Sequence, residues 1–177
     1  EYFNKAQIVD KEGQTRPLVA KEEKIVITGK TPADFVSGGI TPMQSASLLL
    51  ILVAGISIYG IRRGKTLWGI DLILFLVAGM AGCILAFLAL FSQHPAVSPN
   101  YILFVFHPFH LFCLPFMLSR VRKREISRYM LVNFAVLTLF IGLWTIIPQR
   151  IPPAVLPLAL CLLIRSASNL ILTYKRK

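Results

Sequence analysis

The stretch LWGIDLILFLVAGMAGCILAFLALF, residues 67–91, decides the fold class of this chain. It carries one charged side chain, that of Asp71, within a run long enough to cross a bilayer, since about 20 apolar residues span the ~30 Å hydrocarbon layer. The apolar residues form one block and do not follow a helical or strand period, as they would in a soluble protein. This stretch therefore predicts a transmembrane helix.

Four more apolar blocks indicate that the membrane holds most of the chain. Of 177 residues 55% are hydrophobic and 15% are charged, whereas soluble domains have about 25% charged residues. The further blocks are residues 45–61, 101–118, 129–147 and 153–174. We predict an all-α integral membrane protein, a five-span helix bundle. The third block contains two prolines, Pro108 and Pro115, each of which removes a backbone donor, so a re-entrant segment is the alternative there.

The distribution of Lys and Arg predicts the orientation of the bundle. Basic clusters follow the first, third and fifth blocks, while the loop after the second block has no Lys or Arg and the loop after the fourth has only Arg150. Cytoplasmic loops collect Lys and Arg. We therefore expect the amino end outside the cytoplasm and the carboxyl end inside it. The net charge of +11 is explained by this topology, so we predict no nucleic-acid partner.

Residues 1–44 form a separate segment, which we expect outside the cytoplasm. The runs KAQIVDKEGQTRPLV and KEEKIVITG are typical of short strands around a turn. We interpret this β-like segment as the trailing part of an extracytoplasmic domain plus a linker, with a disordered tail as the alternative. Because the chain starts at Glu1 without a Met, we expect it to be the carboxyl-terminal part of a longer protein. Residues 45–177 are the predicted transmembrane domain.

The residues beyond 44 offer no recognisable catalytic set. Cys83, Cys113 and Cys161 lie inside apolar blocks, where the reactive thiolate is disfavoured and no Cys-x-x-Cys metal motif is formed. Only two carboxylates occur there, and Glu125 lies among cytoplasmic cations. We therefore predict no catalytic residue, metal or cofactor in this segment.

Two polar helix faces inside the membrane predict an ion pair. One face combines a carboxylate with small residues: Asp71, Phe75, Gly79, Gly82 and Ala86. The fifth block carries a polar face: Cys161, Arg165, Asn169 and Thr173. A charge inside a membrane is costly and finds a partner. We expect Asp71 to pair with Arg165, either as a lock between helices or as part of a lipid or proton site.

His107 and His110 lie three residues apart within the third block. They would share one side of a helix that continued through Pro108. Two histidines can begin a metal or haem site, but no further ligands follow at a recognisable spacing. We expect them to be hydrogen-bonded within the bundle or to face a wet crevice near the outer surface.

The segments GIDLILFLVAGMAGCILAFLALFSQHPAVSPNYILFVFHPFHLF (69–112) and IIPQRIPPAVLPLALCLLIRS (146–166) resemble the membrane half of the Lnb-like family of Bacteroides lipoprotein N-acyltransferases. Gln93 departs from that pattern, because it replaces an acidic residue, and His107 does not belong to it. The positions that match the pattern are Asp71, Gly79, Gly82, His94, Asn100, Pro108, His110, Pro148, Gln149 and Arg165.

This resemblance implies an envelope enzyme of the bacterial inner membrane. Such an enzyme moves an acyl chain from a phospholipid to the amino-terminal, lipid-modified cysteine of a lipoprotein. Its thiol-dependent catalytic domain is expected outside the membrane, before the spans and largely absent from this chain. The present segment would anchor that domain, and its partners would be a phospholipid, the lipoprotein and the catalytic domain. The alternatives are a non-catalytic anchor or scaffold for an envelope partner, and a small transporter or haem carrier.

The resemblance and the charge pattern together nominate lipid-positioning residues. The outer loops would hold His94, Asn100 and Gln149, and His110 would lie about ten residues into the third span. A kink at Pro108 would tilt His110 toward a polar crevice. We expect these four residues to bind a phospholipid headgroup or glyceryl ester.

The orientation can be tested by labelling single cysteines in intact spheroplasts. Cysteines introduced at Ser98 and Gln149 should react with an impermeant thiol reagent, and one introduced at Glu125 should not. Labelling at Glu125 without labelling at Ser98 would invert the predicted topology.

Overall fold

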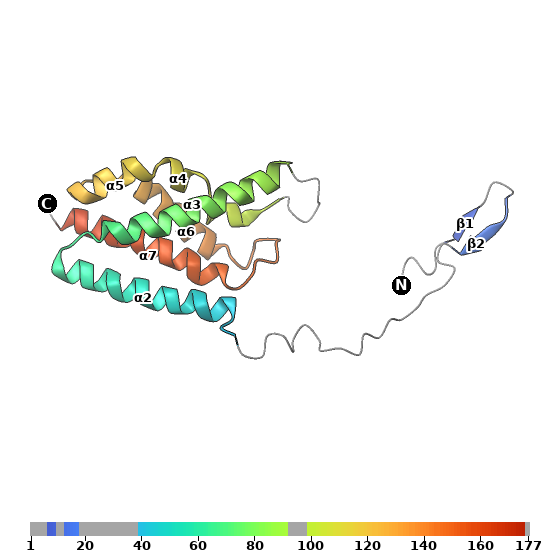
Figure 1. Cartoon of the computed structure of the whole chain (residues 1–177), viewed down its shortest axis with the longest axis horizontal. Coiled ribbons are helices and arrows are strands. Elements are labelled where there is room, and N and C mark those ends of the chain that lie inside the picture. Colours follow the sequence, from blue (N-terminus) through green and yellow to red (C-terminus); the bar gives the residue numbers. More distant parts are fainter. Residues whose placement is uncertain (1–6, 10–12, 18–38, 92–98, 176–177) are drawn as a thin grey trace. The chain divides into compact units, whose positions relative to one another are not determined.

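The structure is a computed structural model that describes residues 7–9, 13–17, 39–91 and 99–175. The chain divides into two units, residues 1–39 and residues 40–177. The described part of the second unit contains α2 to α7 and one 3-10 helix, η1 (Figure 1).

The first unit contains a short antiparallel hairpin. Strand β1, Gln7–Val9, pairs with β2, Thr15–Pro17, so that Ile8 lies opposite Arg16. Gly13, before β2, has a φ of +80°, a left-handed conformation that favours glycine. The second predicted extended run, residues 21–29, lies outside the described residues.

Helix α2, Pro42–Arg63, is the first apolar block, extended by a few residues at both ends. Thr41 and Gln44 form a capping box, in which each side chain accepts a hydrogen bond from the backbone N–H of the other residue. The helix ends at Gly64, whose φ of 61° is the left-handed conformation of a glycine cap. The turn leads directly into α3, Trp68–Phe91.

The third apolar block is broken into three short helices: η1 (Tyr101–Phe104), α4 (Phe109–Phe112) and α5 (Leu114–Lys123). The segment Tyr101–Phe112 is bent by 78° relative to α5. The third block, predicted over residues 101–118 and interrupted by its two prolines, is therefore bent within the block, and its helix runs on to Lys123. Pro108 and Pro115 lack backbone N–H groups, which allows these breaks, and both prolines lie where a helix starts. A broken span and a re-entrant loop both fit this geometry.

The last two helices complete the second unit. Helix α6, Arg128–Gly142, has 15 residues, because the apolar run that follows it to residue 147 forms turns. Helix α7, Val155–Tyr174, begins after Pro152 and Pro153. The helical character of the second unit is confirmed for its described residues up to 175, which are 40–91 and 99–175. Of the helices described, however, three (α2, α3 and α7) are long and apolar enough to cross a membrane, or four if the bent segment is one span.

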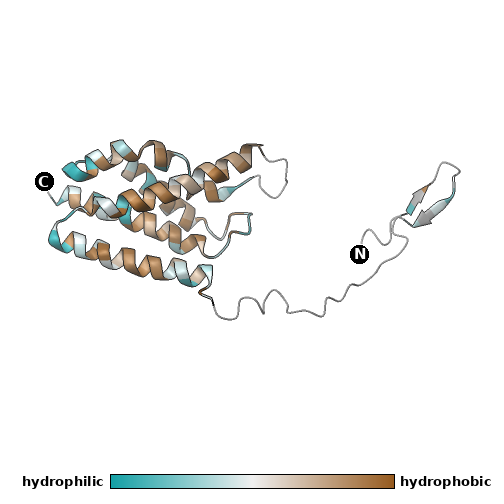
Figure 2. Cartoon of the chain, viewed as in Figure 1, coloured by the Kyte–Doolittle hydropathy of each residue, from teal (hydrophilic) through white to brown (hydrophobic). Residues whose placement is uncertain are grey.

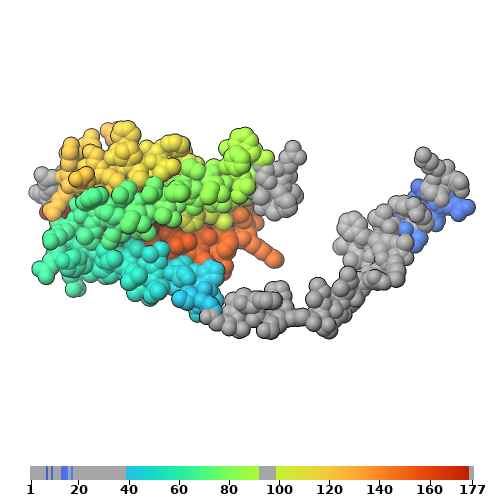
Figure 3. Space-filling model, in the orientation of Figure 1, coloured from blue at the N-terminus to red at the C-terminus, as the bar shows by residue number. Residues whose placement is uncertain are grey.

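Helix α7 is the centre of the packing. It packs against α2 on one side and α6 on another, while α3 packs mainly against α4 and α5. The outer faces of the helices remain apolar, as the brown ribbons in Figure 2 show, and large side chains such as Leu90, Phe116 and Ile146 are exposed. In the space-filling view of Figure 3, α3 runs across the middle of the visible face with α5 above it. Such a surface suits contact with lipid.

The basic loop after α2 and the basic loop after α5 meet at one end of the bundle, which we call the basic end. The Arg124 side chain donates a hydrogen bond to the carbonyl oxygen of Gly64, and the Arg122 guanidinium lies 4.7 Å from the centroid of the Trp68 ring. The carboxyl end of α7 lies on the same side in Figure 1. At the opposite end, which we call the far end, the side-chain oxygen of Gln149 accepts a hydrogen bond of 2.8 Å from the backbone N–H of Tyr101.

Two glycines allow the broken segment to approach α3 closely. A Cβ atom at Gly79 would lie 2.6 Å from the backbone nitrogen of Leu111, and one at Gly82 would lie 2.5 Å from the backbone carbon of His107. Real Cβ atoms essentially never come so near to backbone. The small-residue face predicted around Asp71 is thus the surface on which the third block rests.

We therefore expect Gly82→Ala to lower the free energy of unfolding by about 1–3 kcal/mol, since the added methyl group must displace the backbone at His107. The matched control is Gly55→Ala in α2, where a Cβ atom meets nothing within 4 Å. Thermal unfolding of the detergent-purified protein measures both. An equal effect of the two substitutions would contradict the close-contact interpretation.

Candidate functional site

A buried ion pair links α3 to α7. Arg165 Nε donates to Asp71 Oδ1 at 2.7 Å, and Arg165 Nη2 donates to Asp71 Oδ2 at 3.0 Å. This is the bidentate geometry in which guanidinium and carboxylate pair most strongly. The side chains are 1% and 0% exposed, respectively. The expected partners are therefore in direct contact and withdrawn from solvent.

Neighbouring polar groups complete this pair. Arg165 Nη1 donates to the Ser57 hydroxyl of α2 at 3.0 Å, and Asn169 Nδ2 donates to Asp71 Oδ2 at 3.0 Å. A buried ion pair is stable only when further hydrogen bonds satisfy its remaining donors and acceptors. The network joins α2, α3 and α7. The network therefore connects the three long helices through side-chain hydrogen bonds.

His110 belongs to a second cluster, which connects α4 to the start of α6. The atom His110 Nε2 lies 2.8 Å from the carbonyl oxygen of Val105, and the Tyr129 hydroxyl lies 2.5 Å from His110 Nδ1. A carbonyl oxygen can only accept, so Nε2 carries the proton and Nδ1 accepts from Tyr129. The imidazole is fully buried, and the Phe75 ring packs edge-on against it at 5.3 Å between centroids.

His107 stacks on His110, with ring centroids 3.9 Å apart and planes at 16°. The helix that contains His110 starts at Phe109, so His107 lies outside it, before Pro108. The turn at Pro108 brings the two imidazole rings together. His107 Nδ1 is buried and has no hydrogen-bond partner among the residues that the structure describes. Within the described parts of the chain, no group of three or more His, Cys, Asp and Glu side chains is placed to hold a metal ion.

The lipid-positioning residues expected from the sequence fall into two places. Gln149 and Asn100 meet at the far end, where Gln149 binds Tyr101 N–H and Asn100 Oδ1 accepts from Ile102 N–H at the start of η1. His110 lies instead in the buried cluster with Tyr129. His94 lies outside the described residues.

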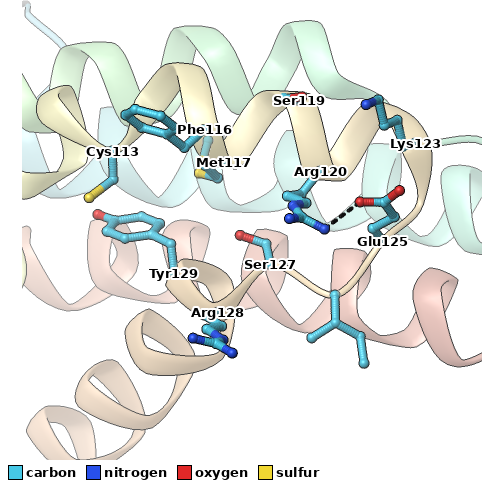
Figure 4. A pocket seen from close by; sticks show the side chains of 11 residues that line it. Cys113, Phe116, Met117, Ser119, Arg120, Lys123, Glu125, Ser127, Arg128 and Tyr129 are labelled. Carbon is cyan, nitrogen blue, oxygen red and sulfur yellow. Dashed lines mark hydrogen bonds and ion pairs between the residues drawn. The ribbon is translucent and has the colours of Figure 1, made fainter.

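A polar cleft at the basic end was not expected from the sequence. It has a volume of about 1120 Å3 and lies between α5 and the first turn of α6. Figure 4 shows Arg120 hydrogen-bonded to Glu125 (2.6 Å), with Ser127, Arg128 and Tyr129 along the opposite wall. One sequence signal points to this cleft: Tyr129 directly follows a basic loop. Tyr at such a position is typical of the membrane interface.

The fold and this site define a class of protein, a multi-helix membrane domain held together by a buried ion pair. The chain belongs to the Lnb transmembrane domain family, whose sequence model matches residues 34–177. The expected resemblance to that family is thereby confirmed. No curated protein and no solved structure matches the chain.

The buried Asp71–Arg165 pair predicts how much stability each of its two charges contributes. Asp71→Ala and Arg165→Ala should each lower the free energy of unfolding by about 3–5 kcal/mol, because each leaves one buried charge without its partner. The double variant should lose much less than the sum of the two.

The exposed pair Arg120–Glu125 provides the matched control, since its side chains are 61% and 43% exposed. Its coupling in the same thermal-melt cycle should be about 1 kcal/mol or less. Additivity within about 0.5 kcal/mol for Asp71 and Arg165 would exclude their coupling.

Proposed function

We propose that this chain is the membrane domain of a lipoprotein N-acyltransferase. Such an enzyme transfers an acyl chain from a phospholipid to the amino-terminal diacylglyceryl-cysteine of a lipoprotein. The observation that carries the proposal is membership of the Lnb transmembrane domain family over most of the chain. The domain's role in the reaction is to anchor an extracytoplasmic catalytic domain and to position both lipid substrates.

The proposed orientation has the basic end in the cytoplasm of a bacterial inner membrane. The Lys and Arg distribution supports it, and the contact of Arg124 with Gly64 brings the two internal basic loops to the same end. The far end then faces the envelope. It is the end at which the catalytic domain and the lipoprotein meet the outer leaflet.

At the far end, Asn100 and Gln149 are the proposed contacts for a headgroup or glyceryl ester. Both side chains already hold backbone at this end: Gln149 binds Tyr101 N–H, and Asn100 caps η1. They therefore fix the start of η1. His94 precedes η1 in sequence and is proposed to contact the same lipid.

His110 contributes by a different route. It is buried and bonded to Val105 and Tyr129, so it determines how the bent segment is attached to α6. We assign it to the support of the far-end surface, which lies on the same bent segment. Its substitution should affect acyl transfer through the position of η1.

The test is acylation of a reporter lipoprotein in a strain that depends on the full-length protein. His94→Ala and Gln149→Ala should lower the N-acylated fraction by about tenfold or more, because small displacements of a substrate have large effects on rate. Mass spectrometry of the reporter's amino-terminal peptide measures this fraction. Membrane level and thermal unfolding of each variant are measured in parallel.

The matched control is Gln44→Ala. Like Gln149, Gln44 accepts a hydrogen bond from a backbone N–H, in its case within the capping box of α2. Its acylated fraction should stay at the wild-type level. Normal acylation in His94→Ala, His110→Ala and Gln149→Ala would refute a role of these residues in lipid positioning. A scaffold for different chemistry would then be the better description.

A further inference from the structure

Three neighbouring clefts lie along α6 and share lining residues, and together we call them the α6 groove. The polar cleft at the basic end shares Cys113, Arg128 and Tyr129 with an apolar cleft of about 570 Å3. That cleft in turn shares Phe104 and Val136 with a third cleft of about 360 Å3. The groove therefore follows α6 from its first residue toward the far end, with the bent segment as its other wall.

The basic end of the groove is positively charged. Arg120, Lys123 and Arg128 line it, with Glu125 as the only carboxylate among its lining residues. Arg120 is bonded to Glu125, whereas exposed Arg128 makes no ion pair with any residue that the structure describes. In Figure 4 the Tyr129 side chain points toward Cys113, where the polar cleft passes into the apolar one.

The rest of the groove is apolar and open to the side. Phe104, Val132 and Leu139 line it and are each more than half exposed. Helix α6 extends ~21 Å from Arg128 to its end, at 1.5 Å per residue. One leaflet contributes about half of the ~30 Å hydrocarbon layer. The apolar part is thus long enough for an acyl chain that starts at Arg128.

One buried polar group beside the groove lacks a partner. Asn133 lines the apolar cleft and is 2% exposed. Its Nδ2 donates to the Ser166 hydroxyl, and its Oδ1 has no hydrogen-bond partner among the described residues. Buried polar atoms in proteins are normally satisfied. When the amide is turned over, Oδ1 accepts from the Ser166 hydroxyl and Nδ2 is free to donate to an ester carbonyl of a lipid, five residues along α6 from a phosphate at Arg128.

We propose that the α6 groove binds one anionic phospholipid, with its phosphate at Arg128 and Arg120 and one acyl chain along α6. Basic pockets between membrane helices recognise anionic headgroups in this way. The site is at the opposite end of the bundle from the residues proposed to position the substrates. It is therefore independent of the proposed acyl transfer. Its occupant would support α6 against the bent segment, where only His110 and Tyr129 otherwise join them by a side-chain hydrogen bond among the described residues.

The test is a native mass-spectrometry titration of the full chain with phosphatidylglycerol and with phosphatidylcholine of identical acyl chains. The protein should retain one phosphatidylglycerol in preference to phosphatidylcholine. Arg128→Gln should weaken phosphatidylglycerol binding about tenfold, the effect of one lost hydrogen bond to a charged group. Val136→Trp should fill the groove and weaken the binding of both lipids to a similar degree.

Two controls separate a site from general surface attraction. Arg62→Gln removes the same charge near the same membrane surface but outside the groove, and should leave the affinity within about twofold of wild type. Ile58→Trp adds the same bulk to an exposed face of α2 and should have no effect. Equal affinity for the two lipids, equal losses in the Arg128 and Arg62 variants, or no loss in Val136→Trp would each overturn the proposal. Displacement of the lipid by glycerol phosphate at equal concentration would also overturn it, because the acyl chain would then contribute nothing.

Discussion

The bidentate contact between Asp71 and Arg165 is the constraint on which the arrangement of the long helices depends. Helix α3 makes few other contacts with α7, and α2 joins the network through Ser57. In a medium with little water, neither charge is stable alone. Apolar packing between membrane helices is weakly directional, because lipid tails are as apolar as the side chains they replace. The ion pair therefore supplies the specificity that apolar contact lacks.

Farther along the same face of α3, the absence of side chains allows close packing. Gly79 and Gly82 let the backbone of the bent segment rest on the helix, and the bend turns α5 toward the basic end. This path brings His110 to Tyr129 and leaves the α6 groove between the bent segment and α6. Helix α3 is thus fixed by charge at its first turn and by close backbone contact farther along the same face. The groove results from the second.

The sequence predicts the parts of this structure that depend on local composition. The apolar blocks, the small-residue face of α3 and the pairing of two opposite intramembrane charges follow from the cost of placing each group in a bilayer. Pro108 and Pro115 mark the weak block. The 78° bend and the extension of α5 to Lys123 do not follow, because prolines allow a break without setting its direction. The His110–Tyr129 and Gln149–Tyr101 contacts depend on that direction, so no local pattern reveals them.

The separation of the two charges along the chain has a consequence for synthesis. Arg165 follows Asp71 by 94 residues, with the bent segment and α6 between them. At about 5–20 residues per second, a ribosome needs roughly 5–20 s to produce the partner after Asp71 has emerged. During that interval the carboxylate of a newly made α3 has no guanidinium to bind. Asp71 lies in the first turn of its helix, so the nascent segment can keep this side chain at the lipid headgroups until α7 is inserted. Final burial of Asp71 is then a late step of assembly, and it can occur only after Arg165 has been translated.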